Sequence, residues 1–119
     1  MTMMADDAQA VLQAKLQAMR PRFVAAVTER LGTLEALRDR LDEEPEDGDA
    51  IAALTHGAHK LAGVAGMFGA ADLGDCAREA ENALEALMAA DEVDEEQYGD
   101  ALDLVDDLLG EMALIVNEG

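Results

Sequence analysis

The chain has 119 residues, which is enough to bury one hydrophobic core but not two. Its formal net charge is −19, from 27 acidic and 8 basic side chains, so nucleic-acid phosphates and anionic membranes would repel it. Half of the residues are hydrophobic but only 3% are aromatic, and alanine and leucine supply most of the apolar surface. This composition favours helices and predicts an all-α protein that binds neither nucleic acid nor membrane.

Targeting signals and cysteine content indicate the compartment. The chain starts at a methionine, and no basic segment followed by an apolar stretch suggests a secretory signal. No apolar run approaches the roughly 18 residues of a membrane-spanning helix. Cys76 is the sole cysteine and cannot form an internal disulfide, so a reducing cytoplasm is expected. We expect one cytoplasmic, monomeric domain over residues 1–119, with residues 1–5 flexible.

Apolar residues spaced three and four apart predict five helical segments. The first, at about residues 6–19, has one apolar face, and Pro21 is expected to interrupt it. That face consists of Ala8, Val11, Leu12, Leu16 and Met19. The second segment spans about residues 23–41 and has a regular three-four repeat. The acidic stretch 43–49, which contains a proline and a glycine, is typical of a loop.

The third segment begins after Asp49, a candidate N-cap, and ends near Gly66 and Gly69. Its apolar seam is Ile51, Leu54, Ala58, Leu61, Ala65 and Phe68. The fourth segment spans about residues 73–87. Its apolar stripe is Leu73, Cys76, Ala77, Ala80, Leu84 and Leu87.

The fifth segment follows Asp94 and Gln97, which resemble a capping box, and runs to about residue 116. Its stripe is Tyr98, Leu102, Val105, Leu109, Met112 and Val116. Apolar stripes must be buried against one another, and short loops make neighbouring helices antiparallel. We therefore expect an up-down four-helix bundle with an additional short N-terminal helix laid across it.

Residues 50–71 lack acidic side chains altogether, although an even distribution would place about five there. The segment contains both histidines of the chain and Lys60. At about 100° per residue, His59 points about 130° away from the apolar seam, toward solvent. The residues around it on the helix are small apart from one histidine, and they are Ala52, Thr55, His56, Ala62, Gly63 and Gly66. Glycine inside a helix costs up to about 1 kcal/mol relative to alanine, so these positions suggest close approach by another protein.

An exposed imidazole can serve as a phosphoryl acceptor. The unperturbed group has a pKa of about 6.5, so most rings are neutral at pH 7 and keep a nucleophilic lone pair. The sequence contains no Gly-rich phosphate loop and no nucleotide-binding fingerprint. A phosphoryl group would therefore have to come from another protein. The alternative is that His59 is an ordinary surface residue.

The sequence resembles the histidine-containing phosphotransfer (HPt) domains over an 18-residue motif. The residues that carry the resemblance are His59, Leu61, Gly63, Gly69, Ala70, Leu73 and Cys76. The resemblance implies that His59 accepts phosphate on its outer ring nitrogen from an aspartyl phosphate of a receiver domain. It further implies transfer to a second receiver, so that the partners are a hybrid histidine kinase and a response regulator. The chain would have no ATP site and no bound cofactor, because the receiver supplies Mg²⁺.

One position departs from the family pattern. The family has a lysine three residues after the histidine, where this chain has Ala62, and the nearby lysine is Lys60. Rotation places Lys60 about 100° from His59, on another flank of the helix. His56 or a basic group of the partner could substitute, and Lys60 and Arg78 are candidate cations at the rim of the partner surface.

The same residues allow other functions. His56 and His59 could share a metal ion, but no acid or cysteine nearby in sequence completes a zinc site, so no metal is expected. Cys76 lies on an inward stripe, where a cysteine behaves as a small hydrophobe rather than a redox thiol. A helical adaptor that binds partners through the neutral patch around His59, without phosphate chemistry, is the alternative function.

Overall fold

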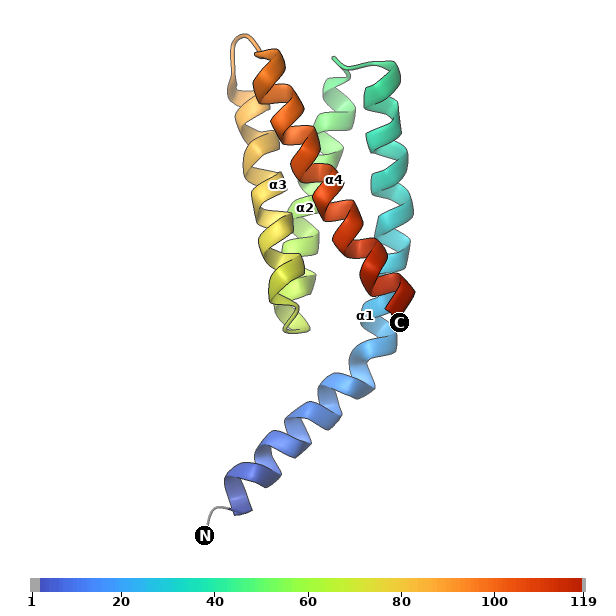
Figure 1. The fold of residues 1–119 in the computed structure, drawn as a ribbon, viewed down its shortest axis with the longest axis vertical. Helices are drawn as coiled ribbons and strands as arrows, with labels where there is room; N and C mark the ends of the chain where they lie inside the picture. Colours follow the sequence, from blue (N-terminus) through green and yellow to red (C-terminus); the bar gives the residue numbers. More distant parts are fainter. Residues whose placement is uncertain (1–2, 119) are drawn as a thin grey trace.

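A computed structural model describes residues 3–118 of the protein, and these form four α-helices joined by short connections. The helices are α1 (Met3–Glu43), α2 (Gly48–Met67), α3 (Ala71–Ala89) and α4 (Glu95–Glu118). They alternate in direction and pack side by side as a bundle (Figure 1). This confirms the predicted all-α, up-down four-helix bundle. Among the described residues, no helix is both long and apolar enough to span a lipid bilayer.

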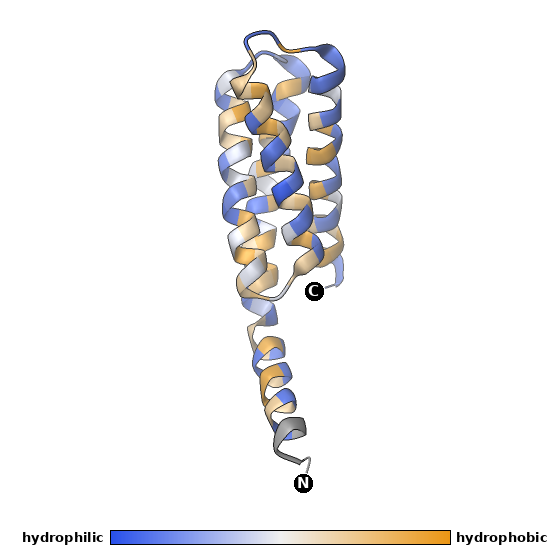
Figure 2. Cartoon of the chain, turned by 90° about the vertical axis from the view of Figure 1, so that its left-hand side faces the viewer, coloured by the Kyte–Doolittle hydropathy of each residue, from blue (hydrophilic) through white to orange (hydrophobic). Residues whose placement is uncertain are grey.

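The bundle forms because each helix buries one apolar stripe. In α2, Leu54, Ala58 and Leu61 are buried along the predicted seam, and the aliphatic side chains of the other three helices pack against them. The largest fully buried side chains are Phe23, Leu41, Leu61, Leu73, Leu84, Leu108, Met112, Val27 and Val105. Many core positions are alanine, which brings helices close together. Hydrophilic and hydrophobic residues alternate along each helix (Figure 2), and among the described residues Thr55 is the only buried polar one.

The separate N-terminal helix was predicted wrongly. Residues 3–43 form one helix, α1, with Pro21 inside it. Proline removes a backbone N–H donor and usually kinks a helix, and α1 bends near this level without ending (Figure 1). Helix-forming residues on both sides of Pro21 allow the helix to continue.

The first part of α1 also does not lie across the bundle. It projects beyond it, so that the molecule is 62 Å long (Figure 1). Val11, Leu12 and Leu16, which were expected to face the core, are 54%, 57% and 39% exposed. Core packing of α1 begins at Phe23. Residues 1 and 2 of the segment expected to be flexible lie outside the described residues, and Met3–Ala5 belong to α1.

The start of α2 differs by two residues from the prediction. The N-cap is Asp47, not Asp49, and its Oδ1 accepts a hydrogen bond of 3.0 Å from the backbone N–H of Ala50. Its other oxygen, Oδ2, lies 2.6 Å from Nη2 of Arg40. Both aspartates suit the helix start, but Asp47 has the extended backbone of a cap, while Asp49 lies in the first turn, where a negative charge is also favourable.

A tight turn joins α2 to α3 and makes them antiparallel. Gly69 adopts φ +68°, a left-handed conformation that favours glycine, as its predicted role at the helix end requires. The N–H of Ala70 donates to the carbonyl of Ala65 at 2.9 Å, as in a Schellman motif. Beside the turn, the Phe23 and Phe68 rings pack with centroids 5.0 Å apart and close this end of the bundle.

The buried face of α4 is rotated by about one residue from the predicted stripe. Val105 and Met112 are buried as expected, but Tyr98 and Leu102 are only partly buried. The centre of the face instead contains Ala101, Val105, Leu108, Met112 and Ile115. The physical reason is that α4 packs against both α1 and α3 and so buries a wide face. Asp94 does cap this helix, since its Oδ1 accepts a 3.3 Å hydrogen bond from the N–H of Glu96.

Candidate functional site

His59 projects into solvent from the middle of α2, as the rotation argument predicted. Its side chain is 71% exposed. The ring is held by one contact, in which Nδ1 lies 2.8 Å from Oε1 of Glu81 on α3. The Glu81 side chain is only 15% exposed, so the seam between α2 and α3 fixes the carboxylate under the ring.

The contact with Glu81 selects one tautomer of the His59 ring. An ionised carboxylate can only accept a hydrogen bond, so Nδ1 is the donor. A neutral imidazole has one N–H, and Nε2 of His59 therefore keeps its lone pair. The result is an oriented imidazole with an unprotonated outer nitrogen. Such a nitrogen is a nucleophile that other molecules can reach.

Glu81 is the neighbour of His59 that the sequence did not predict. Residues 50–71 contain no acidic side chain, and Glu81 comes from another helix, α3. The sequence predicted a neutral surface around His59, but the carboxylate of Glu81 makes part of this surface acidic. In the sequence, Glu81 directly follows Ala80 of the apolar α3 stripe, which places it at the edge of the buried face. Its contact with His59 could be predicted only if the register between α2 and α3 were known.

The glycines near His59 differ in what surrounds them. A Cβ at Gly63 or Gly66 would meet no atom within 4 Å, and both positions are exposed. A Cβ at Gly57 would lie 2.6 Å from Cδ2 of Leu34 on α1. Gly57 therefore lets α1 and α2 pack closely, whereas no neighbour in the described part of the chain requires glycine at 63 or 66. This supports an open surface beside His59.

Two other positions expected around His59 are less exposed than predicted. Thr55 is buried, with its hydroxyl donating to the carbonyl of Ile51 at 2.8 Å, because its face of α2 turns toward the core. Ala62 is half-buried and packs against the core. The open surface around the imidazole thus lies mainly along His56, Gly63 and Gly66.

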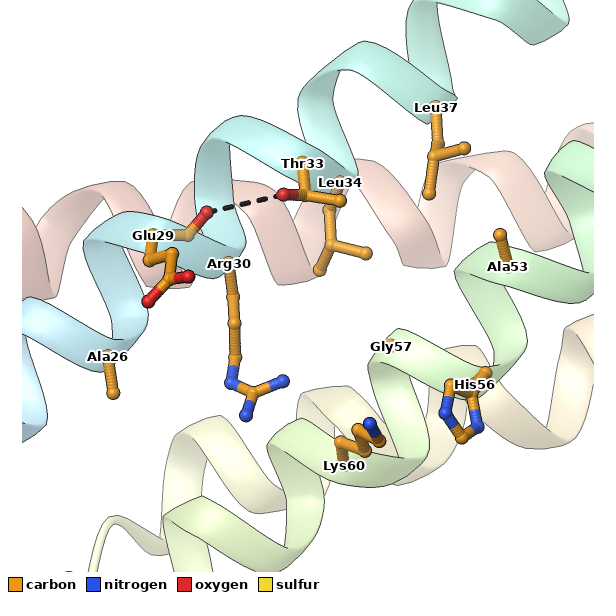
Figure 3. A pocket seen from close by; sticks show the side chains of 10 residues that line it. All are labelled: Ala26, Glu29, Arg30, Thr33, Leu34, Leu37, Ala53, His56, Gly57 and Lys60. Atoms are coloured by element: carbon orange, nitrogen blue, oxygen red, sulfur yellow. Dashed lines mark hydrogen bonds between the residues drawn. The ribbon is translucent and has the colours of Figure 1, made fainter.

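His56 and Lys60 lie on the flank of α2 that faces α1. Together with Arg30 they line a groove of about 390 Å³ between the two helices (Figure 3). Apolar side chains, including Leu34 and Leu37, line the rest of it. Glu81 comes from α3 on the other side of α2, so Lys60 and Glu81 flank His59 from opposite sides.

The motif residues of the third and fourth segments have structural positions. Leu61 and Leu73 are buried in the core, and Gly69 makes the turn. Cys76 is half-buried, and burial raises the pKa of its thiol, which disfavours the reactive thiolate. Across residues 7–118, where side chains are described, no three His, Cys, Asp or Glu side chains form a cluster suited to a metal ion.

The model of the Hpt domain family matches residues 18–113, which include all of α2 and α3 and most of α4, together with the part of α1 that packs in the bundle. No curated protein and no solved structure matches the chain. The match covers most of the chain and contains the exposed histidine, its glycines and the turn at Gly69. The chain therefore belongs to the Hpt family, the histidine phosphotransfer domains of phosphorelays.

Proposed function

We propose that this protein carries a phosphoryl group on Nε2 of His59 between two receiver domains. The observation that carries the proposal is the 2.8 Å contact between Nδ1 of His59 and Glu81, on a ring that is 71% exposed. It leaves a nucleophilic nitrogen directed away from Glu81. His59 is also the histidine that matches the family motif, whereas His56 lies one turn earlier on the flank toward α1.

The chemistry is a nucleophilic exchange at phosphorus. The lone pair of Nε2 attacks the phosphorus of an aspartyl phosphate on the donor receiver. The N–P bond forms as the acyl O–P bond breaks, and the electron pair of that bond returns to the aspartate carboxylate. The His59 ring then carries a positive charge, which the hydrogen bond from Nδ1–H to Glu81 stabilises. The reverse reaction delivers the group to an aspartate of the second receiver.

The surface around His59 suits a protein donor. The open positions at Gly63 and Gly66 leave room for the surface of a receiver domain to approach the His59 ring. In this proposal the receivers belong to a hybrid histidine kinase and a response regulator, and they supply the Mg²⁺ that the reaction needs. The chain itself contributes the nucleophile and its orientation. We expect the exchange to occur in the cytoplasm, between receivers and a monomer of this chain.

A helical adaptor without phosphate chemistry is the alternative, and one experiment separates the two functions. The chain is mixed with a receiver that carries a labelled aspartyl phosphate. Phosphotransfer predicts label on the chain that is stable in base and labile in acid, as expected for a phosphohistidine. Binding of the receiver without any such label would support the adaptor and contradict phosphotransfer.

A further inference from the structure

A phosphoryl group on His59 would need a cation nearby. The group adds between about 1.5 and 2 negative charges at neutral pH, next to Glu81 and in a chain whose net charge is already −19. The chain has only 8 basic side chains. Which of them can reach the group depends on the packing of α2 against α3.

Two contacts, one at His59 and one at Ala65, define the register of α2 against α3. His59 is opposite Glu81, and a Cβ on Gly74 would lie 3.5 Å from the Cβ of Ala65. Because the helices are antiparallel, Ala62 lies midway between His59 and Ala65. Midway along the facing stretch of α3, between Gly74 and Glu81, are Ala77 and Arg78. Ala77 is buried, so Arg78 is the exposed residue roughly level with Ala62, about one turn beyond the imidazole.

The Arg78 side chain runs along the seam toward the N-terminal end of α3, so its guanidinium lies level with Ala65 and away from His59. Its Nη1 and Nη2 atoms are each 3.7 Å from the Cβ position of Gly74, a buried residue that faces α2. Rotation places Arg78 about 60° from Glu81 around α3, on the solvent side of the seam. The side chain is 59% exposed, and Nη2 forms a 2.6 Å ion pair with Oδ1 of Asp75. Among the residues that the structure describes, no other acidic side chain pairs with Arg78, so Nη1 and Nε can bind another anion.

The other cations are less well placed. Arg38 and Arg40 form ion pairs toward the opposite end of the bundle. Arg30 and Lys60 line the groove between α1 and α2, on the flank of α2 away from α3 (Figure 3). The three remaining basic residues belong to the first part of α1, and they are Lys15, Arg20 and Arg22.

We infer that Arg78 is the phosphate-binding cation of this site: its side chain swings from its place beside Gly74 back along the seam, over the small side chain of Ala62, to the phosphoryl group on His59. The inference rests on the proposed function. Before phosphorylation Asp75 holds the guanidinium, and on phosphorylation the guanidinium exchanges this partner, at least in part, for the more highly charged phosphoryl oxygens. Arginine suits this role because its planar donors bind two oxygens at once.

The test compares transfer from a phosphorylated receiver to matched variants. Arg78→Gln should lower the transfer rate at saturating receiver by about tenfold, less than the hundredfold or more typical of a buried oxyanion donor. Lys60→Gln, which removes the same charge on the other flank, should change it less than twofold. Adding Ala62→Lys to Arg78→Gln returns a cation to the same place and should restore most of the rate. Melting temperatures of the two single variants should equal that of the wild type, because both side chains are exposed.

A spectroscopic measurement reads the contact directly. His59 is phosphorylated with phosphoramidate, a small-molecule donor, and the Nε–Hε signal of Arg78 should shift upon phosphorylation. No shift, an unchanged rate in Arg78→Gln, or a larger loss in Lys60→Gln would overturn the inference. If the wild-type chain takes no label from any receiver, the proposed function fails instead, and the phosphoramidate experiment still decides whether Arg78 binds the phosphoryl group.

Discussion

The hydrogen bond between His59 and Glu81 determines which ring nitrogen can react. Without the carboxylate, both tautomers of the exposed ring would be populated, and the ring could rotate. A hydrogen bond to a charged group contributes about 1.5–3 kcal/mol. The hydrogen bond becomes stronger as positive charge develops on the ring in the transition state. This additional stabilisation accelerates transfer.

We predict that Glu81→Ala slows phosphoryl transfer to His59 by at least about tenfold, the equivalent of about 1.4 kcal/mol. Glu81→Gln should lose less, because its amide oxygen can still accept the bond from Nδ1. Single-turnover transfer from a phosphorylated receiver measures both. Glu85→Gln, at an exposed position one turn further along α3, is the charge-matched control. Equal rates in Glu81→Ala and in the control would exclude a role for the carboxylate.

The exposed position of His59 could be predicted from sequence, whereas its partner could not. Exposure follows from the angle between His59 and the apolar seam of a single helix. Glu81 is 22 residues away, and its contact depends on the length of the turn at Gly69 and on how closely alanine-rich faces approach. A shift of one residue in that register would move the carboxylate away from the ring.

At the scale of helices, Gly57 and Gly63 of α2 have different roles. Gly57 allows α1 and α2 to pack closely, and Gly63 leaves the surface beside His59 open to a partner. Alanine improves helix propensity by up to about 1 kcal/mol at either Gly57 or Gly63. At Gly57 the added methyl group overlaps Leu34, and overpacking costs about 1–3 kcal/mol. We predict that Gly57→Ala is less stable than Gly63→Ala by an amount in that range, measured by urea unfolding.

Bulk at Gly63 should instead affect transfer. Gly63→Gln should melt at the wild-type temperature or above it and slow transfer steeply, because the side chain enters the space that the receiver needs. A displacement of about 1 Å between reacting groups can cost on the order of a hundredfold. Full transfer by Gly63→Gln, or identical stability of the two alanine variants, would refute this assignment of the glycines.

The cap of α2 predicts a dependence of stability on pH. The hydrogen bond from the Ala50 N–H, followed by the contact with Arg40, lowers the pKa of Asp47. A carboxyl whose pKa is lower in the folded state stabilises the fold above its unfolded pKa, about 3.9, and this contribution is lost as the pH falls through the folded value. Asp47→Ala should therefore lower the melting temperature at pH 7, with a smaller difference below pH about 4. A difference that stays constant with pH would contradict the assignment.

The sequence pattern predicted which segments are helical more accurately than it predicted where the helices begin and end. The apolar stripes of α2 and α3 were predicted nearly residue by residue because each has a narrow buried face. Pro21 was expected to end a helix, but local propensity on both sides outweighed its cost. Asp47 and Asp49 are both good caps, and only the backbone conformation at Asp47 distinguishes them.

At the scale of the whole molecule, the part of the chain before the bend of α1 differs from the bundle in net charge and in the burial of its apolar side chains. Residues 1–22 contain two acidic and three basic side chains, so the remaining chain carries a net charge of −20. Val11, Leu12 and Leu16 in this first part are exposed, while Phe23 is 2% exposed. The stable core therefore begins at Phe23.

We predict that deletion of residues 1–18 leaves both the melting temperature and phosphoryl transfer unchanged, because residues 7–18 are all exposed. Phe23→Ala is the contrasting variant and should cost about 3–5 kcal/mol, as for other buried aromatic residues. Thermal unfolding and the receiver assay measure the two properties. A large loss of stability on deletion would show that the segment packs against the bundle.

The central claim is that His59, and not His56, carries the phosphoryl group. The most direct measurement is labelling by a phosphorylated receiver of the wild-type chain, His59→Gln and His56→Gln, with circular dichroism to establish that all three are folded. We predict no label on His59→Gln and only a modestly slower reaction for His56→Gln. Label on His59→Gln at the wild-type level would contradict the account.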